Sequence, residues 1–162
     1  MLTILDTDVL SNLRKEKKHP AVVAWVQQMG WADLSTTVIN ISEIQCGIER
    51  QRPTHPVYAA ETERWLGRLL EAGAPYVWPL GTIAALIFAR MHETPALRQF
   101  VVSDPRGKRL ASPGDLAIAA IAIDLGAVIA TGNVAHFRQI HAVFPLPGVF
   151  DPFRSEWVIA AG

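Results

Sequence analysis

Short apolar segments alternate with longer segments of helical period along almost the whole chain. Short apolar runs bounded by turn residues predict buried strands. The predicted strands are "LTIL" (2–5), "DLSTT" (33–37), "PYVWPL" (75–80), "AVIAT" (127–131) and, at an edge of the sheet, "PGVFDP" (147–152). Strands that alternate with helices pair in parallel and need a helix layer on each face. The pattern therefore predicts an α/β fold with a central, mostly parallel β-sheet flanked by α-helices on both faces.

Helices are predicted between these strands. One follows the second strand, where Val38, Ile41, Ile44 and Ile48 recur every three or four residues and form an apolar stripe. Another opens with Asp115 and continues almost entirely with Leu, Ala and Ile, so its start is predicted to be buried. Further helical segments are predicted early in 9–20, over 19–30, 60–73, 82–100 with a break near Pro95, and 133–140, with a loop at 103–114.

Composition limits the classes of protein to which the chain can belong. Half of its 162 residues are hydrophobic and no repeat or Gly/Ser-rich linker divides it, so a single domain over 1–162 is predicted. Fifteen Lys and Arg balance fifteen Asp and Glu, so a nucleic acid would have to be held by local charge. The start lacks a signal-peptide pattern, and the longest clean apolar run, Leu116–Ile123, is too short to span a membrane. With one cysteine, Cys46, these features favour a cytoplasmic protein.

Polar side chains occupy positions where the predicted fold places apolar ones. Asp6 leaves the first strand, Asn133 leaves the strand at 127–131, Glu43 lies on the helix after the second strand, and Asp115 opens the apolar helix. In a parallel sheet, ligands and catalytic groups collect beyond the carboxyl ends of the strands. Carboxylates gathered there in a poorly hydrated cleft either take up protons or hold a cation, and oxygen ligands select Mg²⁺ or Mn²⁺. The sequence therefore favours a metal site.

Plainer roles remain open for each of these residues. Asp115 could cap its helix, Asp6 could close a turn, Glu43 could lie on the surface, and Asn133 could serve in a turn or cap. Only the convergence of these four residues at one edge of the sheet favours a metal-binding or catalytic role over these structural roles.

The same residues carry a family resemblance. The segments "LDTDVLSNL", "LSTTVINISEIQCGI", "SPGDLAIAAIAIDLGAVIATGNVAHF" and "GVFDPF" occur in the order typical of PIN-domain ribonucleases, and within them of VapC-like toxins of toxin–antitoxin pairs. The resemblance covers residues 2 to about 153. It implies a metal-dependent endoribonuclease that hydrolyses RNA phosphodiester bonds with Mg²⁺ or Mn²⁺.

The resemblance also implies roles for individual residues. The family's metal-binding acids map onto Asp6, Glu43 and Asp115, while Thr7, Asp8 and Thr131 match supporting positions around the site. Asn133 stands where Asp is frequent, so one negative charge is missing and the choice between one and two ions is left open. His136 stands where an acid is also common and is expected to be a surface residue beside the site.

Partners follow from the resemblance and from local charge. The basic clusters Arg14, Lys15, Lys17, Lys18 and Arg106, Lys108, Arg109 could guide RNA, or they could simply be solvated faces. VapC-like toxins pair with a small antitoxin protein and often form homodimers. Apolar residues beyond the obvious needs of one small core are compatible with such contacts: Trp25, Trp65, Leu69, Leu70 and Phe88.

The sequence leaves two alternatives to this function open. A metal-free PIN-like binding or regulatory module would explain Asn133. A haloacid dehalogenase-type phosphohydrolase would use Asp6 as nucleophile and Asp8 as acid, but Lys108 lies awkwardly for orienting a phosphate and Ala119 stands where a second late acid is needed.

Overall fold

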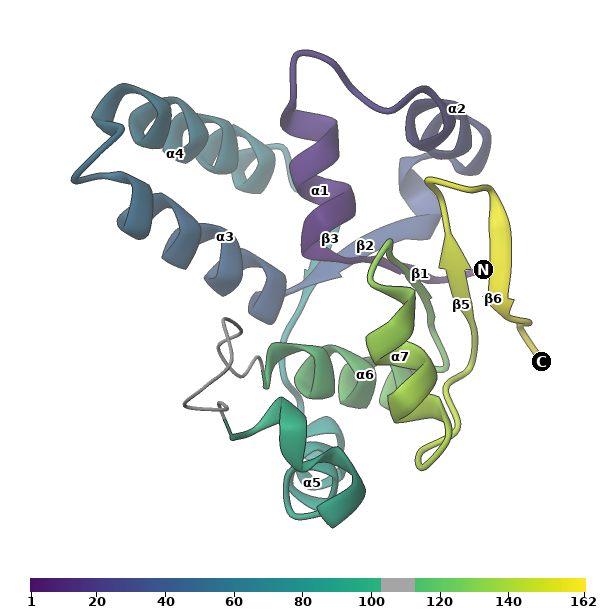
Figure 1. The fold of residues 1–162 in the computed structure, drawn as a ribbon. Helices are drawn as coiled ribbons and strands as arrows, with labels where there is room; N and C mark the ends of the chain where they lie inside the picture. The colour runs from purple at the N-terminus through teal and green to yellow at the C-terminus, as the bar shows by residue number, and fades with distance from the viewer. Residues whose placement is uncertain (103–112) are drawn as a thin grey trace.

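A six-stranded sheet runs through the middle of the molecule (Figure 1). The computed structural model describes residues 1–102 and 113–162. Within these residues the strand order is β3-β2-β1-β4-β5-β6, with every neighbouring pair parallel except β5 and β6. The strands are β1 (Thr3–Leu5), β2 (Leu34–Thr37), β3 (Tyr76–Trp78), β4 (Val128–Ala130), β5 (Val149–Asp151) and β6 (Glu156–Ile159). The predicted fold class, an α/β domain with a mostly parallel sheet, is confirmed.

Helices cover both faces of this sheet (Figure 1). One face carries α1 (Thr7–Arg14), α2 (Pro20–Met29), α3 (Val38–Gln51) and α4 (Pro56–Glu71). The other carries α5 (Thr82–His92), α6 (Gly114–Leu125) and α7 (Val134–His141), while the short 3-10 helices η1 (Trp31–Asp33) and η2 (Pro95–Phe100) lie in connections. In the described part of the chain, no helix is both long enough and apolar enough to cross a membrane.

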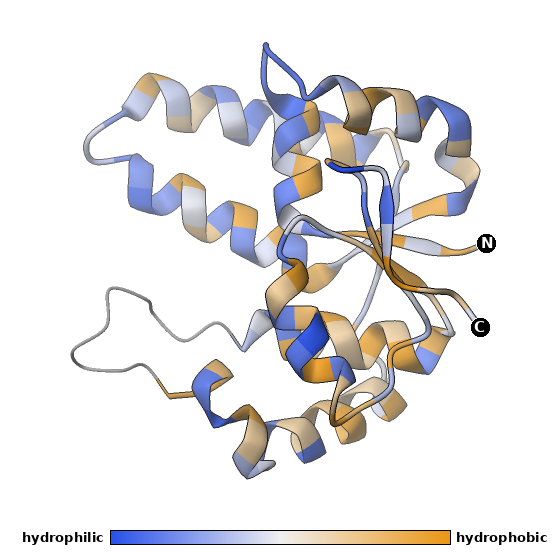
Figure 2. Ribbon diagram, turned by 45° about the vertical axis from the view of Figure 1, so that its right-hand side comes forward, coloured by the Kyte–Doolittle hydropathy of each residue, from blue (hydrophilic) through white to orange (hydrophobic). Residues whose placement is uncertain are grey.

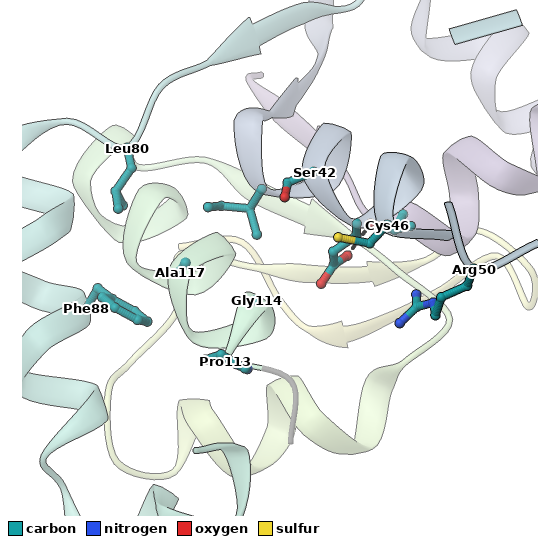
Figure 3. Close-up of a pocket in the computed structure, with 11 residues that line it drawn as sticks. Ser42, Cys46, Arg50, Leu80, Phe88, Pro113, Gly114 and Ala117 are labelled. Carbon is teal, nitrogen blue, oxygen red and sulfur yellow. Dashed lines mark hydrogen bonds between the residues drawn. The ribbon is translucent and has the colours of Figure 1, made fainter. Parts of the chain in front are cut away.

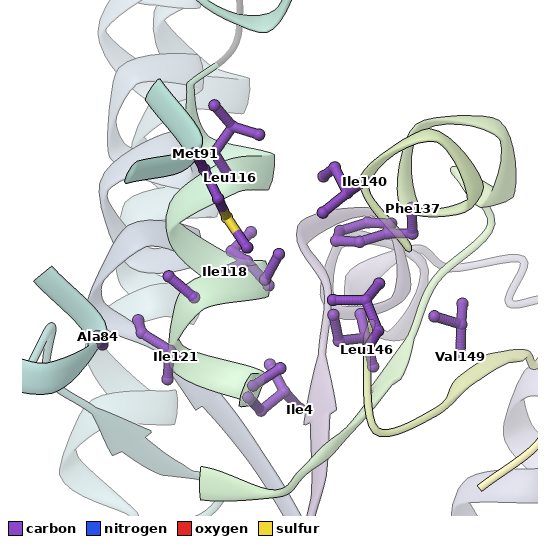
Figure 4. Packing of buried hydrophobic residues seen from close by; sticks show 14 of the residues in the cluster. Ile4, Ala84, Met91, Leu116, Ile118, Ile121, Phe137, Ile140, Leu146 and Val149 are labelled. Carbon is purple, nitrogen blue, oxygen red and sulfur yellow. The ribbon is translucent and has the colours of Figure 1, made fainter. Parts of the chain in front are cut away.

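The sheet separates two hydrophobic cores. Alternate residues of a strand point to opposite faces, and β1 follows this rule: Ile4 packs in the core beneath α5, α6 and α7, whereas Leu5 packs beneath α1 to α4. In β4, Ile129 and Ala130 divide in the same way. Figure 4 shows the first core, where side chains of α6 and α7 meet Ile4.

Helix α6 lies at the centre of the molecule. All its residues from Asp115 to Ala122 are buried, because α3, α5, α7 and the sheet surround it. Figure 2 shows hydrophobic residues running through the strands, whereas α3 and α4 alternate between hydrophobic and hydrophilic residues. The predicted burial of the start of α6 is confirmed, and this burial brings the carboxylate of Asp115 into the interior.

Three local predictions were wrong. The segment 147–152 contains β5, but the edge strand is β6, which pairs antiparallel with β5 after a turn held by backbone N–H groups donating to the side chain of Asp151. Helix α4 begins at Pro56, a full turn before the predicted start, because proline is favoured in a helix's first turn. Val38 of the predicted stripe is 40% exposed, and Asn40 occupies the buried face instead.

Candidate active site

Parallel pairing brings the ends of three strands to one edge of the sheet. Asp6 directly follows β1, Thr131 directly follows β4, and Thr37 ends β2. The first turn of α6 approaches the same edge with Asp115. Side chains far apart in the sequence therefore meet where helices from both faces also begin.

Asp6 is held by three hydrogen bonds in a buried position. It is 4% exposed, and as the N-cap of α1 it accepts a hydrogen bond of 2.7 Å from the backbone N–H of Thr7. Thr131 donates to its other carboxylate oxygen at 2.7 Å, and Asn40 donates at 3.2 Å. The plainer role considered for Asp6 was to close a turn after its strand, and the structure shows it instead as the N-cap of α1, with a carboxylate that also bonds to Thr131 and Asn40.

Asn40 links Asp6 to Glu43. Its amide donates to Asp6 and, at 3.1 Å, to the hydroxyl of Thr7, which in turn donates to Glu43 at 2.5 Å. Asn40 is fully buried, and its carbonyl accepts from Thr37 in a capping box that begins α3. Glu43 is half-buried. Thr7 therefore holds one oxygen of Glu43 toward the edge of the sheet.

Asp115 forms a compact group with Asn133 and His136. The Oδ2 atom of Asp115 accepts from Nδ2 of Asn133 at 3.2 Å and lies 2.5 Å from Nδ1 of His136. Nδ1 of His136 also lies 2.8 Å from Nδ2 of Asn133. Helix α6 begins at Gly114 with Pro113 as its N-cap, so Asp115 does not cap it. The backbone N–H of Asn133 donates to Thr131, which joins this group to Asp6.

Asp8 contributes a buried carboxylate oxygen for which the described residues offer no partner. Its Oδ2 accepts from the backbone N–H of Gly132 at 2.8 Å. Its Oδ1 is buried and has no hydrogen-bond partner within residues 1–102 and 113–162. A buried oxygen of this kind is costly unless a proton or a cation satisfies it.

Burial raises the pKa of all three aspartates, and repulsion from other acids adds to the shift at Asp6 and Asp8. Burial raises the pKa of Asp6 well above its ordinary value, and the charges of Asp8 and Asp115 raise it further. Burial likewise raises the pKa of Asp8, against the opposing hydrogen bond from Gly132. Burial raises the pKa of Asp115, although His136 partly offsets this shift. The charged forms of these groups are therefore disfavoured until something positive joins them.

The donor chemistry fits a hard divalent cation, because the clustered carboxylate oxygens are ligands of the kind that Mg²⁺ and Mn²⁺ take. The unsatisfied Oδ1 of Asp8 points to the same chemistry. Among the described residues, no group of three or more His, Cys, Asp or Glu side chains is already placed to hold a metal ion. The ligand set Asp6, Glu43 and Asp115 stays a prediction.

A hollow of about 650 Å³ adjoins this cluster between α3, α5 and α6 (Figure 3). Thr7, Glu43 and Gly114 belong to its lining. Leu80 and Phe88 lie at one end and Arg50 at the other (Figure 3). Gly114 leaves room for Glu43 here, because a Cβ at this position would collide with the carboxylate of Glu43 in its present position.

The structure brings together most of the predicted site residues. Asp6, Thr7, Glu43, Asp115, Thr131 and Asn133 belong to one hydrogen-bonded network, and Asp8 lies close enough for its charge to raise the pKa of Asp6. Arg14 and Lys15 lie at the end of α1, outside this network. Arg106, Lys108 and Arg109 fall outside the described residues.

Sequence analysis missed the roles of two residues. His136, expected on the surface, is half-buried against Asp115 and packs edge-on against Phe100 at 5.2 Å. Asn40 was overlooked because an Asn three residues after a Thr is a less familiar capping-box signal than Glu or Gln. Its position three residues after Thr37 could have identified it.

The chain resembles known proteins in sequence and in fold. The PIN domain family matches residues 3–142. Ribonuclease VapC14 of Mycobacterium tuberculosis (strain CDC 1551 / Oshkosh) is 35% identical over 65 residues, which are 40% of this chain and 63% of that protein. The chain thus spans less than two thirds of the length of this relative.

Solved structures share the fold. FitAcB from Neisseria gonorrhoeae superposes with a TM-score of 0.64 at 23% identity, covering 94% of this chain and 99% of the other. VapBC2 from Rickettsia felis, solved bound to a DNA fragment from its promoter, has a TM-score of 0.60 at 16% identity and covers 93% and 100%. The matched family spans nearly all strands and helices that build the carboxylate edge, and this chain belongs to the PIN domain family.

Proposed function

We propose that this protein is a divalent-metal-dependent endoribonuclease that hydrolyses RNA phosphodiester bonds as the toxin of a toxin–antitoxin pair. The observation that carries the proposal is the hydrogen-bonded network joining Asp6, Glu43, Asp115 and Asn133 across four separate segments of the chain. Keeping several acids together in a poorly hydrated position is costly for the fold, and a bound cation would offset that cost. Ribonuclease VapC14 supports RNA as the substrate.

Asp6, Glu43 and Asp115 would hold the ion, with Asp8 as the nearest additional carboxylate. A bound Mg²⁺ or Mn²⁺ ion would lower the pKa of a water molecule and neutralise charge at the phosphoryl group. The protein's own contribution is orientation. Thr131 and Asn40 fix the carboxylate of Asp6, and Thr7 fixes that of Glu43. His136 and Asn133 fix Asp115 and add no negative charge that would repel the RNA backbone.

Partners and location are part of the proposal. A small antitoxin would cover the cleft, two copies of the chain would form a homodimer, and the protein would act in the cytoplasm. Leu70 is 46% exposed, and Trp25, Trp65, Leu69 and Phe88 are partly buried against the cores, which leaves apolar surface for such contacts. The haloacid dehalogenase alternative has no support from the family match.

RNA cleavage with purified protein tests the proposal. Wild-type protein should cleave single-stranded RNA with Mg²⁺ or Mn²⁺ and should stop when EDTA removes the ion. Asp115→Asn should lower the cleavage rate on the order of 10²-fold or more, the scale seen when one electrostatic stabilising group is lost. Asp6→Asn should behave in the same way.

Asp124→Asn provides the matched control, because Asp124 lies on the same helix as Asp115 but is exposed. It should cleave RNA at the wild-type rate. Equal rates for Asp115→Asn and Asp124→Asn, or cleavage that persists in EDTA, would overturn the metal-dependent mechanism. No cleavage by correctly folded wild-type protein with either ion would favour the metal-free binding module.

A further inference from the structure

A second hollow of about 350 Å³ lies between α1, α3 and α4, a volume within the range of ligand pockets, ~300–1,000 Å³. It shares Thr7, Glu43 and Arg50 with the hollow beside the carboxylates, so the two lie next to each other along α3. Thr7 and Glu43 stand at the junction, next to the reacting centre of the proposed function. A ligand in the second hollow would therefore lie next to the proposed reacting centre.

The lining of the second hollow is positively charged, although the chain as a whole has a net charge of zero. Arg14, Lys15 and Arg50 contribute three positive charges, and Glu43 contributes the one acid among its described residues. Arg50 and Lys15 form no ion pair within the described residues. Arg52, two positions from Arg50, is instead tied to Glu49 and Glu63. Arg50 and Lys15 are thus available to an anionic ligand, whereas Arg14 contacts Tyr58.

Tyr58 gives the same hollow an aromatic wall. Its side chain is 46% exposed on α4, with the guanidinium of Arg14 lying 4.7 Å from the ring centroid and donating to its hydroxyl. An exposed tyrosine ring beside cations matches the way proteins bind single-stranded RNA, in which bases stack on aromatic rings and phosphates contact Lys or Arg. A protein partner would more typically bury a patch of apolar residues, whereas most of the residues that line this hollow are polar or charged, although apolar atoms make up the larger part of its surface.

We propose that the hollow between α1, α3 and α4 binds one nucleotide of single-stranded RNA beside the scissile phosphate, with the base stacked on the face of the Tyr58 ring that Arg14 does not cover and the phosphate held by Arg50 and Lys15. The proposal rests on the proposed ribonuclease function for the identity of the substrate. It assigns the substrate's path along α3, from the carboxylates toward Tyr58.

Fluorescence anisotropy tests the subsite with a labelled single-stranded RNA in EDTA, where binding is measured without cleavage. Tyr58→Ala should weaken binding at least about fivefold, the lower end of the cost of losing one stacked base. Tyr58→Phe keeps the ring and should restore most of the affinity. Arg50→Ala should weaken binding and reduce the slope of log Kd against log salt concentration by about 0.7, the value for one phosphate contact on a single strand.

Two controls keep the result specific. Arg64→Ala removes an exposed arginine of α4 that does not line the hollow, and it should bind RNA like wild type with an unchanged salt slope. Double-stranded RNA of the same sequence should be insensitive to Tyr58→Ala, because paired bases cannot stack on the ring. Thermal melting checks that every variant is folded.

The outcomes separate the two proposals. If wild type cleaves RNA but Tyr58→Ala and Arg50→Ala bind RNA as wild type does, the subsite is wrong while the ribonuclease function stands; a hollow used by a protein partner would give this result. If RNA binding depends on Tyr58 but no ion supports cleavage, the subsite stands and the catalytic proposal fails. Wild-type protein that binds no RNA would overturn both.

Discussion

Asp6 is under the strongest electrostatic constraint among the acids of the site. It is almost completely buried, faces the charges of Asp8 and Asp115, and keeps its position through bonds from Thr7, Asn40 and Thr131. Those bonds favour the ionised form, yet burial and repulsion outweigh them, so the pKa remains raised. Keeping the charged carboxylate of Asp6 buried is therefore a cost to the stability of the fold.

This cost predicts a pH-dependent effect of Asp6→Asn on stability. Because the folded-state pKa is raised above 3.8, the contribution of Asp6 to stability is fully present below that pH and is lost as pH rises through the folded-state pKa. In EDTA, Asp6→Asn should therefore melt at a higher temperature than wild type at pH 7. The difference should shrink as pH falls toward 4.

Thermal melting by circular dichroism between pH 4 and 8 measures this effect. Asp124→Asn, an exposed aspartate of α6, should show no comparable change in melting temperature at either end of the range. A variant Asp6→Asn that is less stable than wild type at pH 7 would show that the hydrogen bonds to the carboxylate outweigh its burial.

The start of helix α3 is the element that organises one half of the site. Thr37 and Asn40 satisfy each other's backbone N–H groups in a capping box, and the same Asn40 amide reaches Asp6 and Thr7. A single side chain thus begins the helix and orients Asp6 and Thr7 at the start of α1. A change at the start of α3 would therefore also move Asp6 and Thr7.

Asn40→Ala should therefore be costly although it removes no charge. It leaves the buried hydroxyl and the backbone N–H of Thr37 without the acceptor that they use now, and each unsatisfied buried group costs about 1–3 kcal/mol. Urea denaturation should show a loss of at least about 2 kcal/mol in the free energy of unfolding. Ser42→Ala, an exposed position of the same helix, should change this free energy by less than about 0.5 kcal/mol.

The approach of α6 to α3 controls the second half of the site. A Cβ at Gly114 would overlap the carboxylate of Glu43 and lie 3.4 Å from Cγ2 of Ile39. Because the end of a glutamate side chain can move, Gly114→Ala should fold and displace Glu43. Displacements of about 1 Å in catalytic groups cost up to about 10²-fold in rate. RNA cleavage should therefore fall at least about tenfold while the melting temperature changes little.

Gly67→Ala on α4 is the matched control, because a Cβ there meets nothing within 4 Å. It should stabilise the protein by about 0.4–1 kcal/mol and leave cleavage unchanged. Normal cleavage by Gly114→Ala would show that the position of Glu43 does not matter for the reaction.

The site joins the two layers of the whole molecule. Helices α1 and α3 approach the carboxyl edge from one face of the sheet, and α6 and α7 approach it from the other (Figure 1). Repulsion among acids from both layers therefore opposes the packing of the entire fold. A cation that relieves this repulsion should stabilise the protein globally, since it binds the folded chain alone.

Mg²⁺ or Mn²⁺ should accordingly raise the melting temperature of wild-type protein. At a free concentration 100 times the Kd, the gain is about 2.7 kcal/mol. The gain should be much smaller in Asp6→Asn. Potassium chloride at the same ionic strength controls for general screening of charge. An equal rise with potassium chloride, or an undiminished gain in Asp6→Asn, would contradict a specific ion site.

The local pattern of apolar and polar residues predicted most of the strands and helices. Apolar runs predicted the strands from β1 to β5, and helical periodicity predicted the helices between them, because these signals arise within a few consecutive residues. The edge strand β6 was not predicted, because "EWVI" becomes extended by pairing with β5. A run of only four residues gives little indication of a strand by itself. The first turn of helix α4 was not predicted, because the buried face of this helix begins only at Ala59 and includes the polar Thr62.

The sequence by itself determined the α/β class, the order of the elements and which acids follow the strand ends, since each depends on neighbours along the chain. Only the tertiary structure decided that His136 reaches Asp115, that Asn40 joins Asp6 to Glu43 through Thr7, and that Tyr58 and Arg50 share a hollow. These contacts depend on how helices from different parts of the chain pack against one sheet. No single stretch of residues determines the distances and angles that this packing sets.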